Sequence, residues 1–136
     1  VDLTEINVPL FNPRIHSNRN IPDEINRLKN KLFKAEKWII CAPEYNGSIP
    51  PILSNIIAWL SISGDDFRNL FNGRPIAIAT FSGGQGTQLL TSLRIQLIPI
   101  STSAYPRQTK PTSRVYHHTS GPKLLTLPFL IREALV

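Results

Sequence analysis

The sequence predicts an α/β fold, a three-layer sandwich in which a parallel β-sheet is covered by helices on both faces. Two observations predict it. Residues 38–42 and 75–80 are short, continuous apolar runs, which is typical of strands covered on both faces. Segments with helical spacing of apolar residues separate these runs, and such alternation favours parallel pairing through crossover helices. The 136 residues suit a single domain spanning residues 1–136.

The first elements are an extended segment and an amphipathic helix. Residues 3–11 alternate loosely and are expected to form a short strand or extended segment, and a loop follows. Asn20 is the expected N-cap of the helix, since Pro22 and two acidic residues suit its first turn. The apolar stripe of this helix comprises Ile21, Ile25, Leu28, Leu32 and Ala35.

After the strand at residues 38–42, a helix from Pro50 to Ser61 is expected, with Ser48 as its N-cap. This helix is apolar on almost every side, and such a helix must be covered on both sides. The sheet would cover one side, and a second subunit is a candidate for the other.

The second half of the chain continues the alternation. A strand at residues 75–80 is followed by a glycine-rich loop at residues 81–87 and then by a helix. The stripe of that helix comprises Leu89, Leu90, Leu93 and Leu97. Residues 98–102 are expected to form a third buried strand, residues 105–123 are irregular, and residues 127–136 form a short amphipathic helix.

The composition excludes several classes of protein. A hydrophobic content of 41% and a charged content of 18% indicate a globular chain and not a disordered one. No apolar run approaches the roughly 18 residues of a membrane span, and the first residues do not resemble a signal peptide. The single cysteine, Cys41, excludes an internal disulfide and indicates a reducing, cytoplasmic location.

The net charge of +6 is unevenly distributed. Residues 1–93 carry nine basic and eight acidic side chains, whereas residues 94–136 carry six basic side chains and one acidic. A basic end can attract phosphate, so a nucleotide-binding module is one alternative. We do not expect a nucleic-acid partner, because the aromatic residues do not interleave with the basic ones.

Ligands of such sheets bind at the carboxyl ends of the strands, where two loops of unusual composition are expected. Residues 43–48 contain Tyr45, with a flat apolar face, and Asn46, with donors and an acceptor. Residues 81–87 contain three glycines, which let backbone N–H groups approach a ligand closely. The two loops together suit a planar heterocycle.

The stretch "PEYNGSIPPILSNIIAWLS" resembles the signature of the NADPH-dependent FMN reductase family, a flavodoxin-like group of oxidoreductases. The match is unbroken from Pro43 to Pro50, "FSGG" resembles the family's second flavin loop, and the resemblance covers roughly residues 1–108. It implies FMN as cofactor, NADPH or NADH as electron donor, and a quinone, azo, metal-oxyanion or free-flavin acceptor. It implies nothing for residues 109–136.

The resemblance also implies a role for each matching position. The implied cofactor-binding residues are Pro43, Glu44, Tyr45, Asn46, Ser82, Gly83 and Gly84. Redox chemistry belongs to the flavin, so no catalytic acid or base is assigned to the chain. Adjacent His117 and His118 have no neighbouring carboxylate or cysteine, so no metal site is expected. A homodimer or homotetramer through the helix from Pro50 to Ser61 is implied.

The family's phosphate loop, which precedes the extended segment in relatives, has no counterpart in this sequence. We therefore expect the first strand and first helix to be missing, a gap that another segment could fill. A degenerate flavodoxin-like protein without redox activity is a further alternative. Ser54 and Ala58 stand where relatives often carry charged residues, and this change makes the interface helix more apolar.

Overall fold

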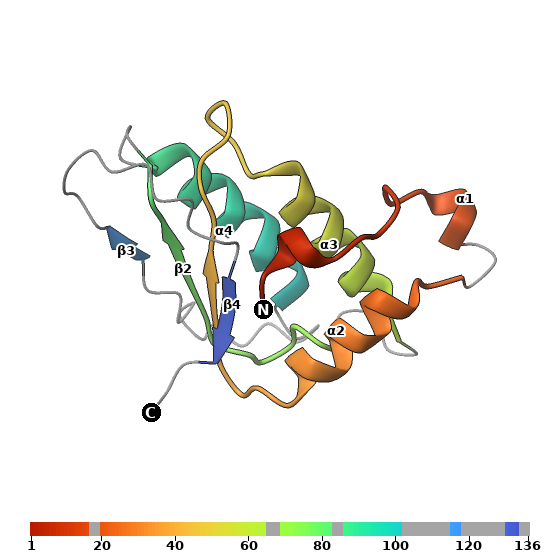
Figure 1. Cartoon of the computed structure of the whole chain (residues 1–136). Coiled ribbons are helices and arrows are strands. Elements are labelled where there is room, and N and C mark those ends of the chain that lie inside the picture. The colour runs from red at the N-terminus through yellow and green to blue at the C-terminus, as the bar shows by residue number, and fades with distance from the viewer. Residues whose placement is uncertain (17–19, 65–68, 83–85, 102–114, 118–129, 134–136) are drawn as a thin grey trace.

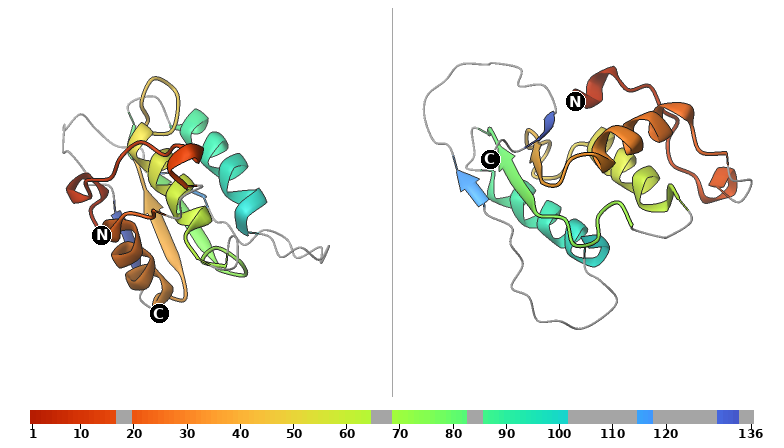
Figure 2. Two further views of the ribbon diagram at one scale, coloured as in Figure 1. Left: turned by 90° about the vertical axis from the view of Figure 1, so that its right-hand side faces the viewer. Right: turned by 90° about the horizontal axis from the view of Figure 1, so that it is seen from below.

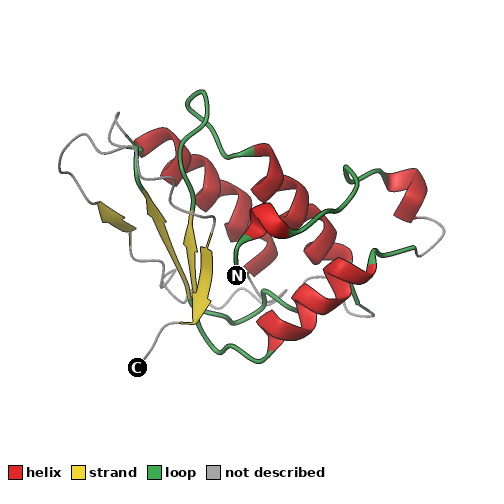
Figure 3. Ribbon diagram, in the orientation of Figure 1, coloured by secondary structure: helices red, strands yellow, loops and turns green. Residues whose placement is uncertain are grey.

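The computed structural model of the chain describes residues 1–16, 20–64, 69–82, 86–101, 115–117 and 130–133. These residues form an α/β fold in which helices pack against a four-stranded sheet of order β3-β2-β1-β4 (Figures 1 and 3). The predicted α/β, flavodoxin-like fold class is confirmed, whereas the second helical layer of the expected three-layer sandwich is not found among the described residues (Figure 2).

The centre of the sheet consists of the two strands that the apolar runs predict. Strands β1 (Trp38–Cys41) and β2 (Ile76–Thr80) pair in parallel, with Trp38 opposite Ile76 and Cys41 opposite Ala79. Strand β3 (Val115–His117) lies parallel to β2 on its other side. Strand β4 (Leu130–Glu133) runs antiparallel to β1. The β4–β1 pair is therefore antiparallel, and the other two strand pairs are parallel.

Three predictions for the second half of the chain are wrong. The expected strand at residues 98–102 is absent, because helix α4 runs from Thr87 to Ser101. A short apolar run fits a buried helix as well as a strand, and Leu97 is buried on the helical spacing that Leu93 begins. The expected helix at residues 127–136 is replaced by β4, and β3 lies within the stretch expected to be irregular.

Strand β4 lies beside β1 on the side away from β2, so β1 does not form an edge of the sheet. The sequence led us to expect that the first strand was missing and that another segment could fill its place. Pairing with β1 satisfies backbone groups of both strands, whereas an isolated helix of about ten residues is only marginally stable in water. The sheet contact therefore outweighs the local helical pattern of these residues.

The described helices α2 (Asp23–Phe33), α3 (Pro51–Ile62) and α4 all lie on one side of the sheet (Figure 2). The strand side chains on this side are buried and pack against the helices in the core. They are Trp38, Ile40, Ile76 and Ile78. The alternate side chains point to the other face and are only partly buried. They are Ile39, Cys41, Ala77 and Ala79.

The N-terminal segment covers the side of α3 that faces away from the sheet. It begins with the 3-10 helix η1 (Leu3–Glu5) and continues as an extended stretch, so the expected strand is absent and the expected extended segment is present. The carbonyl of Pro9 accepts hydrogen bonds from Asn55 Nδ2 at 3.1 Å and from Trp59 Nε1 at 2.9 Å. Phe11 N donates to Asn55 Oδ1 at 2.7 Å. The chain itself therefore covers much of this apolar helix.

Prolines occupy the N-cap positions of α2 and α3, where polar caps were expected. The N-cap of α2 is Pro22 and that of α3 is Pro50, with no side-chain cap bond at either, so the predictions of Asn20 and Ser48 as caps are wrong. Both N-caps therefore lie two residues later than expected, and each proline suits the position before the first turn because its φ angle is fixed and it has no N–H group to satisfy. A single turn, α1 (Pro13–His16), replaces part of the expected loop.

None of the helices in the described part of the chain is long and apolar enough to cross a bilayer.

Candidate functional site

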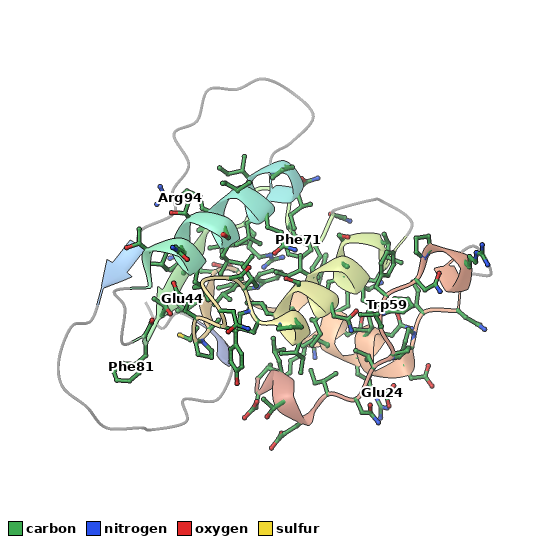
Figure 4. All side chains as sticks on the ribbon, turned by 90° about the horizontal axis from the view of Figure 1, so that it is seen from above. Glu24, Glu44, Trp59, Phe71, Phe81 and Arg94 are labelled. Atoms are coloured by element: carbon green, nitrogen blue, oxygen red, sulfur yellow. The ribbon has the colours of Figure 1, made fainter. Side chains whose placement is uncertain are left out.

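The loops that follow β1 and β2 leave the sheet at the same edge. The two strands are parallel and in register, and Ala42 N donates to the carbonyl of Ala79 at 3.1 Å just past the last paired residues. Figure 4 looks along the strands from above and shows Glu44 and Phe81 on the same side of the molecule, near the start of α4. The predicted loops therefore begin side by side.

The first loop contains a tight reverse turn at residues 45–48. Tyr45 N donates to Ser48 O at 3.0 Å, and Ser48 N donates to Tyr45 O at 2.8 Å. The two central residues both have positive φ angles, 49° at Asn46 and 68° at Gly47. Two positive φ angles define a type I′ turn, for which Asn-Gly is the favoured pair. The Asn-Gly pair of the motif is thus explained by backbone geometry.

The tip of this turn offers groups that a ligand could use. Tyr45 is 56% exposed. Among the described residues, no hydrogen bond uses the backbone N–H groups of Asn46 and Gly47. One flat ring and two backbone donors are therefore available within three consecutive residues.

The Glu44 side chain connects the first loop to the helix that follows the second loop. Glu44 Oε2 accepts a hydrogen bond from the backbone N of Leu89, the third residue of α4, at 3.1 Å. Gly86, which precedes α4, has a φ angle of 65° and no side chain that could cap the helix. The carboxylate of Glu44 therefore acts as the N-terminal cap of α4, although 45 residues separate it from its partner.

Two further close approaches hold the loops together. A Cβ atom added to Gly47 would collide with the Gln88 side chain, so Gln88 packs directly against the turn. A Cβ added to Gly86 would collide with the Thr80 methyl group, so the two ends of the second loop touch. The Thr80 hydroxyl is buried and has no hydrogen-bond partner within the described part of the chain.

The remaining predicted site residues divide into two groups. Pro43 and Ser82 lie half-buried at the starts of the two loops. Gly83 and Gly84 lie outside the described residues. The assignment of cofactor contacts to all seven positions stays a prediction.

Sequence reasoning missed three residues of this site, Thr80, Gln88 and Leu89. The first turn of a helix after a glycine-rich loop is a recognisable place for a contact, but a partner 45 residues away has no sequence signal. The type I′ turn could have been found, because Asn-Gly is a strong short-range signal for it.

The described residues fit a planar heterocycle with polar edges. The Tyr45 ring provides a stacking surface, backbone N–H groups provide donors, and the Thr80 hydroxyl is an unpaired polar atom at the base of the second loop. No group of three or more His, Cys, Asp and Glu side chains gathers in the described part of the chain. The chemistry available here is therefore binding and orientation by neutral donors and an aromatic face.

The family model described as NADPH-dependent FMN reductase matches residues 1–111. A quinone reductase of Escherichia coli (strain K12) is 32% identical over 77 residues, which are 57% of this chain and 39% of that protein. An NADPH azoreductase of Bacillus sp. (strain OY1-2) is 28% identical over 109 residues, which are 79% of this chain and 57% of that protein. The chain thus spans about half the length of these curated relatives.

Among solved structures, the flavoenzyme NAD(P)H:(acceptor) oxidoreductase (FerB) from Paracoccus denitrificans has a similar fold. The TM-score is 0.60 at 23% sequence identity, and the match covers 74% of this chain and 56% of that one. At this identity the likeness supports the fold of the chain and not its activity.

Proposed function

This chain belongs to the NADPH-dependent FMN reductase family, and from that premise we propose that the protein is an FMN-dependent oxidoreductase. It would take hydride from NADPH or NADH and pass it to a small-molecule acceptor. The observation that carries the proposal is the contact of Glu44 and the Tyr45–Ser48 turn with the start of α4, the helix that follows the second loop.

Residues of both loops have a part in holding the flavin. When FMN is bound, the Tyr45 ring would stack on or beside the isoalloxazine, and the backbone N–H groups of Asn46 and Gly47 would donate to its polar edge. Ser82, Gly83 and Gly84 would hold the pyrimidine edge through their backbone groups, and Pro43 would contact the ring from the start of the first loop. When bound, FMN supplies the hydride-transfer chemistry, and the protein supplies position and electrostatic environment.

The acceptor is proposed only as a class. The names of the curated relatives, a quinone reductase and an NADPH azoreductase, support a quinone or azo compound, and a metal oxyanion or free flavin remains an alternative. An exposed turn tip suits acceptors of several shapes, because little protein surrounds the Tyr45 ring to select among them. Steady-state rates with a quinone and an azo dye as competing acceptors would separate these classes.

A homodimer or homotetramer through α3 is also proposed. The side of α3 that remains partly exposed includes Ser54, Ala58 and Ser61, which lie four and three residues apart. Small side chains at this spacing let a second helix approach closely. Light scattering on the full-length protein tests the proposal, and a monomer at micromolar concentration would rule it out.

Titration of the full-length protein with FMN tests the main proposal. We expect saturable binding with a change in the visible absorption of the flavin, followed by bleaching on addition of NADPH or NADH. The alternatives, a degenerate relative without a cofactor and a basic nucleotide-binding module, both predict no flavin uptake. The nucleotide-binding module additionally predicts binding that weakens with salt.

Replacing Tyr45 with alanine is expected to weaken FMN binding about tenfold, because stacking of a heterocycle on an aromatic ring contributes about 1–3 kcal/mol. Tyr45→Phe should bind almost as well as the natural protein, since the ring is retained. The measurement is the dissociation constant from the flavin titration.

Phe33→Ala is the matched control for Tyr45→Ala. Phe33 is exposed to the same degree, 57% against 56%, but it ends α2 at the opposite end of the strands, near Arg74. Its loss should leave FMN affinity unchanged. Equal affinities for Tyr45→Ala and Phe33→Ala would remove Tyr45 from the site.

A further inference from the structure

We propose that Glu44 is a positioning residue, whose carboxylate fixes the start of α4 against the Tyr45–Ser48 turn and so sets the geometry between the two loops. The expected effect on FMN binding rests on the proposed function. The hydrogen bond between Glu44 and Leu89 of α4, called the brace below, does not. The resemblance implies a cofactor contact for this position, and the structure assigns its side chain a different task.

Helix α4 needs an external cap. The first N–H groups of any helix lack intrahelical acceptors, and the first helical bond here is the one from Leu90 N to Gly86 O at 3.0 Å. The N–H of Leu89, one residue earlier, points out of the helix end, and Gly86 has no side chain to receive it. Glu44 fills this role with a charged acceptor at the positive end of the helix dipole, where carboxylates are favoured.

Two contacts with α4 hold the turn, one at its start and one at its tip. Glu44 immediately precedes Tyr45, the first residue of the turn, and it bonds to Leu89. At the tip of the turn, Gly47 packs against Gln88, the neighbour of Leu89 along α4. Two contacts on adjacent residues of one helix turn leave the Tyr45–Ser48 turn little freedom to tilt.

A fixed turn matters for a ligand that lies between two loops. The position of the Tyr45–Ser48 turn against the start of α4 is set before a ligand arrives, so the ligand does not have to order this part of the site as it binds. The Glu44 side chain contributes through Leu89 and not by touching the ligand. Its loss should therefore weaken FMN binding and also free the start of α4 when no FMN is present.

Hydrogen exchange of the Leu89 amide in the flavin-free, full-length protein measures the brace directly. A hydrogen bond to a charged group is strong enough that Glu44→Ala should accelerate this exchange on the order of tenfold or more. Glu44→Asp keeps the charge but shortens the side chain by one methylene group, so it should behave like Glu44→Ala. Glu44→Gln keeps the reach and an acceptor oxygen, so it should retain most of the protection.

The dissociation constant of FMN is the second readout for the same variants. We expect it to rise about tenfold in Glu44→Ala and Glu44→Asp and to change little in Glu44→Gln. Asp2→Ala is the matched control, because the Asp2 carboxylate also accepts from a backbone N–H, that of Thr4 at 2.9 Å, at the start of η1. Its loss should alter neither Leu89 exchange nor FMN binding.

The two readouts separate the brace from the proposed function. Unchanged Leu89 exchange in both Glu44→Ala and Glu44→Asp would overturn the brace, and weakened FMN binding in the same variants would then indicate a direct contact. If the natural protein takes up no FMN, the proposed function fails, and the exchange data still decide whether Glu44 holds α4.

Discussion

Replacement of Trp59 by alanine is expected to lower the free energy of unfolding by about 3–5 kcal/mol, the range for removing a large buried aromatic side chain. Trp59 is completely buried in the core on α3. Its ring meets Phe11 edge to face, with centroids 5.2 Å apart and planes at 89°, and its Nε1 donates to Pro9 O at 2.9 Å. The variant therefore loses core volume and the attachment of the N-terminal segment together.

Trp59→Phe separates these two losses. It keeps an aromatic ring in the core but removes the donor to Pro9, and a hydrogen bond of this kind contributes about 0.5–1.5 kcal/mol. A smaller ring also leaves some empty volume, so we expect a cost well below that of alanine. Urea denaturation at equilibrium measures both variants. A cost below about 1 kcal/mol for Trp59→Ala would mean that the N-terminal segment and α3 do not pack as described.

Replacement of Gly47 by alanine is expected to have the largest effect on the site. Gly47 has a φ angle of 68°, and an added Cβ would collide with Gln88. The left-handed conformation alone costs a non-glycine residue about 1–2 kcal/mol, and the added Cβ also displaces the end of the Gln88 side chain from the turn. We expect FMN binding to fall at least about tenfold, a change measured by the flavin titration.

Gly73→Ala is a close control for this variant. Gly73 has nearly the same φ angle, 67°, but no atom lies within 4 Å of an added Cβ, and the residue precedes β2 at the other end of the strand. Gly73→Ala should lower the free energy of unfolding by the cost of the left-handed conformation, and FMN affinity should not change. Unchanged FMN affinity in Gly47→Ala would contradict the role of the turn in binding.

The sequence was sufficient to predict the elements whose signals are local. The runs at residues 38–42 and 75–80 are apolar and bounded by polar stretches, and they form the two central strands. The stripe from Ile25 to Leu32 is buried on α2 as expected, because helical spacing depends only on neighbours along the chain. The family resemblance of residues 43–50 is confirmed by the match over residues 1–111.

The elements that were predicted wrongly depend on distant partners. Strand β4 pairs with the side of β1 that β2 leaves open, and no feature of residues 130–133 identifies β1 as the partner. Ile98 and Pro99 read as part of a buried strand, but both are exposed on α4. A proline so near the end of a helix removes one backbone bond, and the helix continues only to Ser101.

The residues of the candidate site also divide into those with a local sequence signal and those that depend on distant partners. The composition of its two loops identified Tyr45 and Asn46, because an aromatic ring and an amide together are unusual at the end of a strand. The bond from Leu89 to Glu44 and the packing of Gln88 on Gly47 could not be inferred, since both depend on how β1 and α4 meet in space. The same contacts give the two loops a common geometry.

Amide chemical shifts of the full-length, isotope-labelled protein during titration with FMN test the central claim most directly. We predict saturable shifts that are largest at Tyr45, Asn46, Gly47 and Ser82, with smaller ones at the start of α4. Saturable binding whose shifts cluster elsewhere, with these four amides unmoved, would contradict the assignment of the flavin to the rim between the two loops.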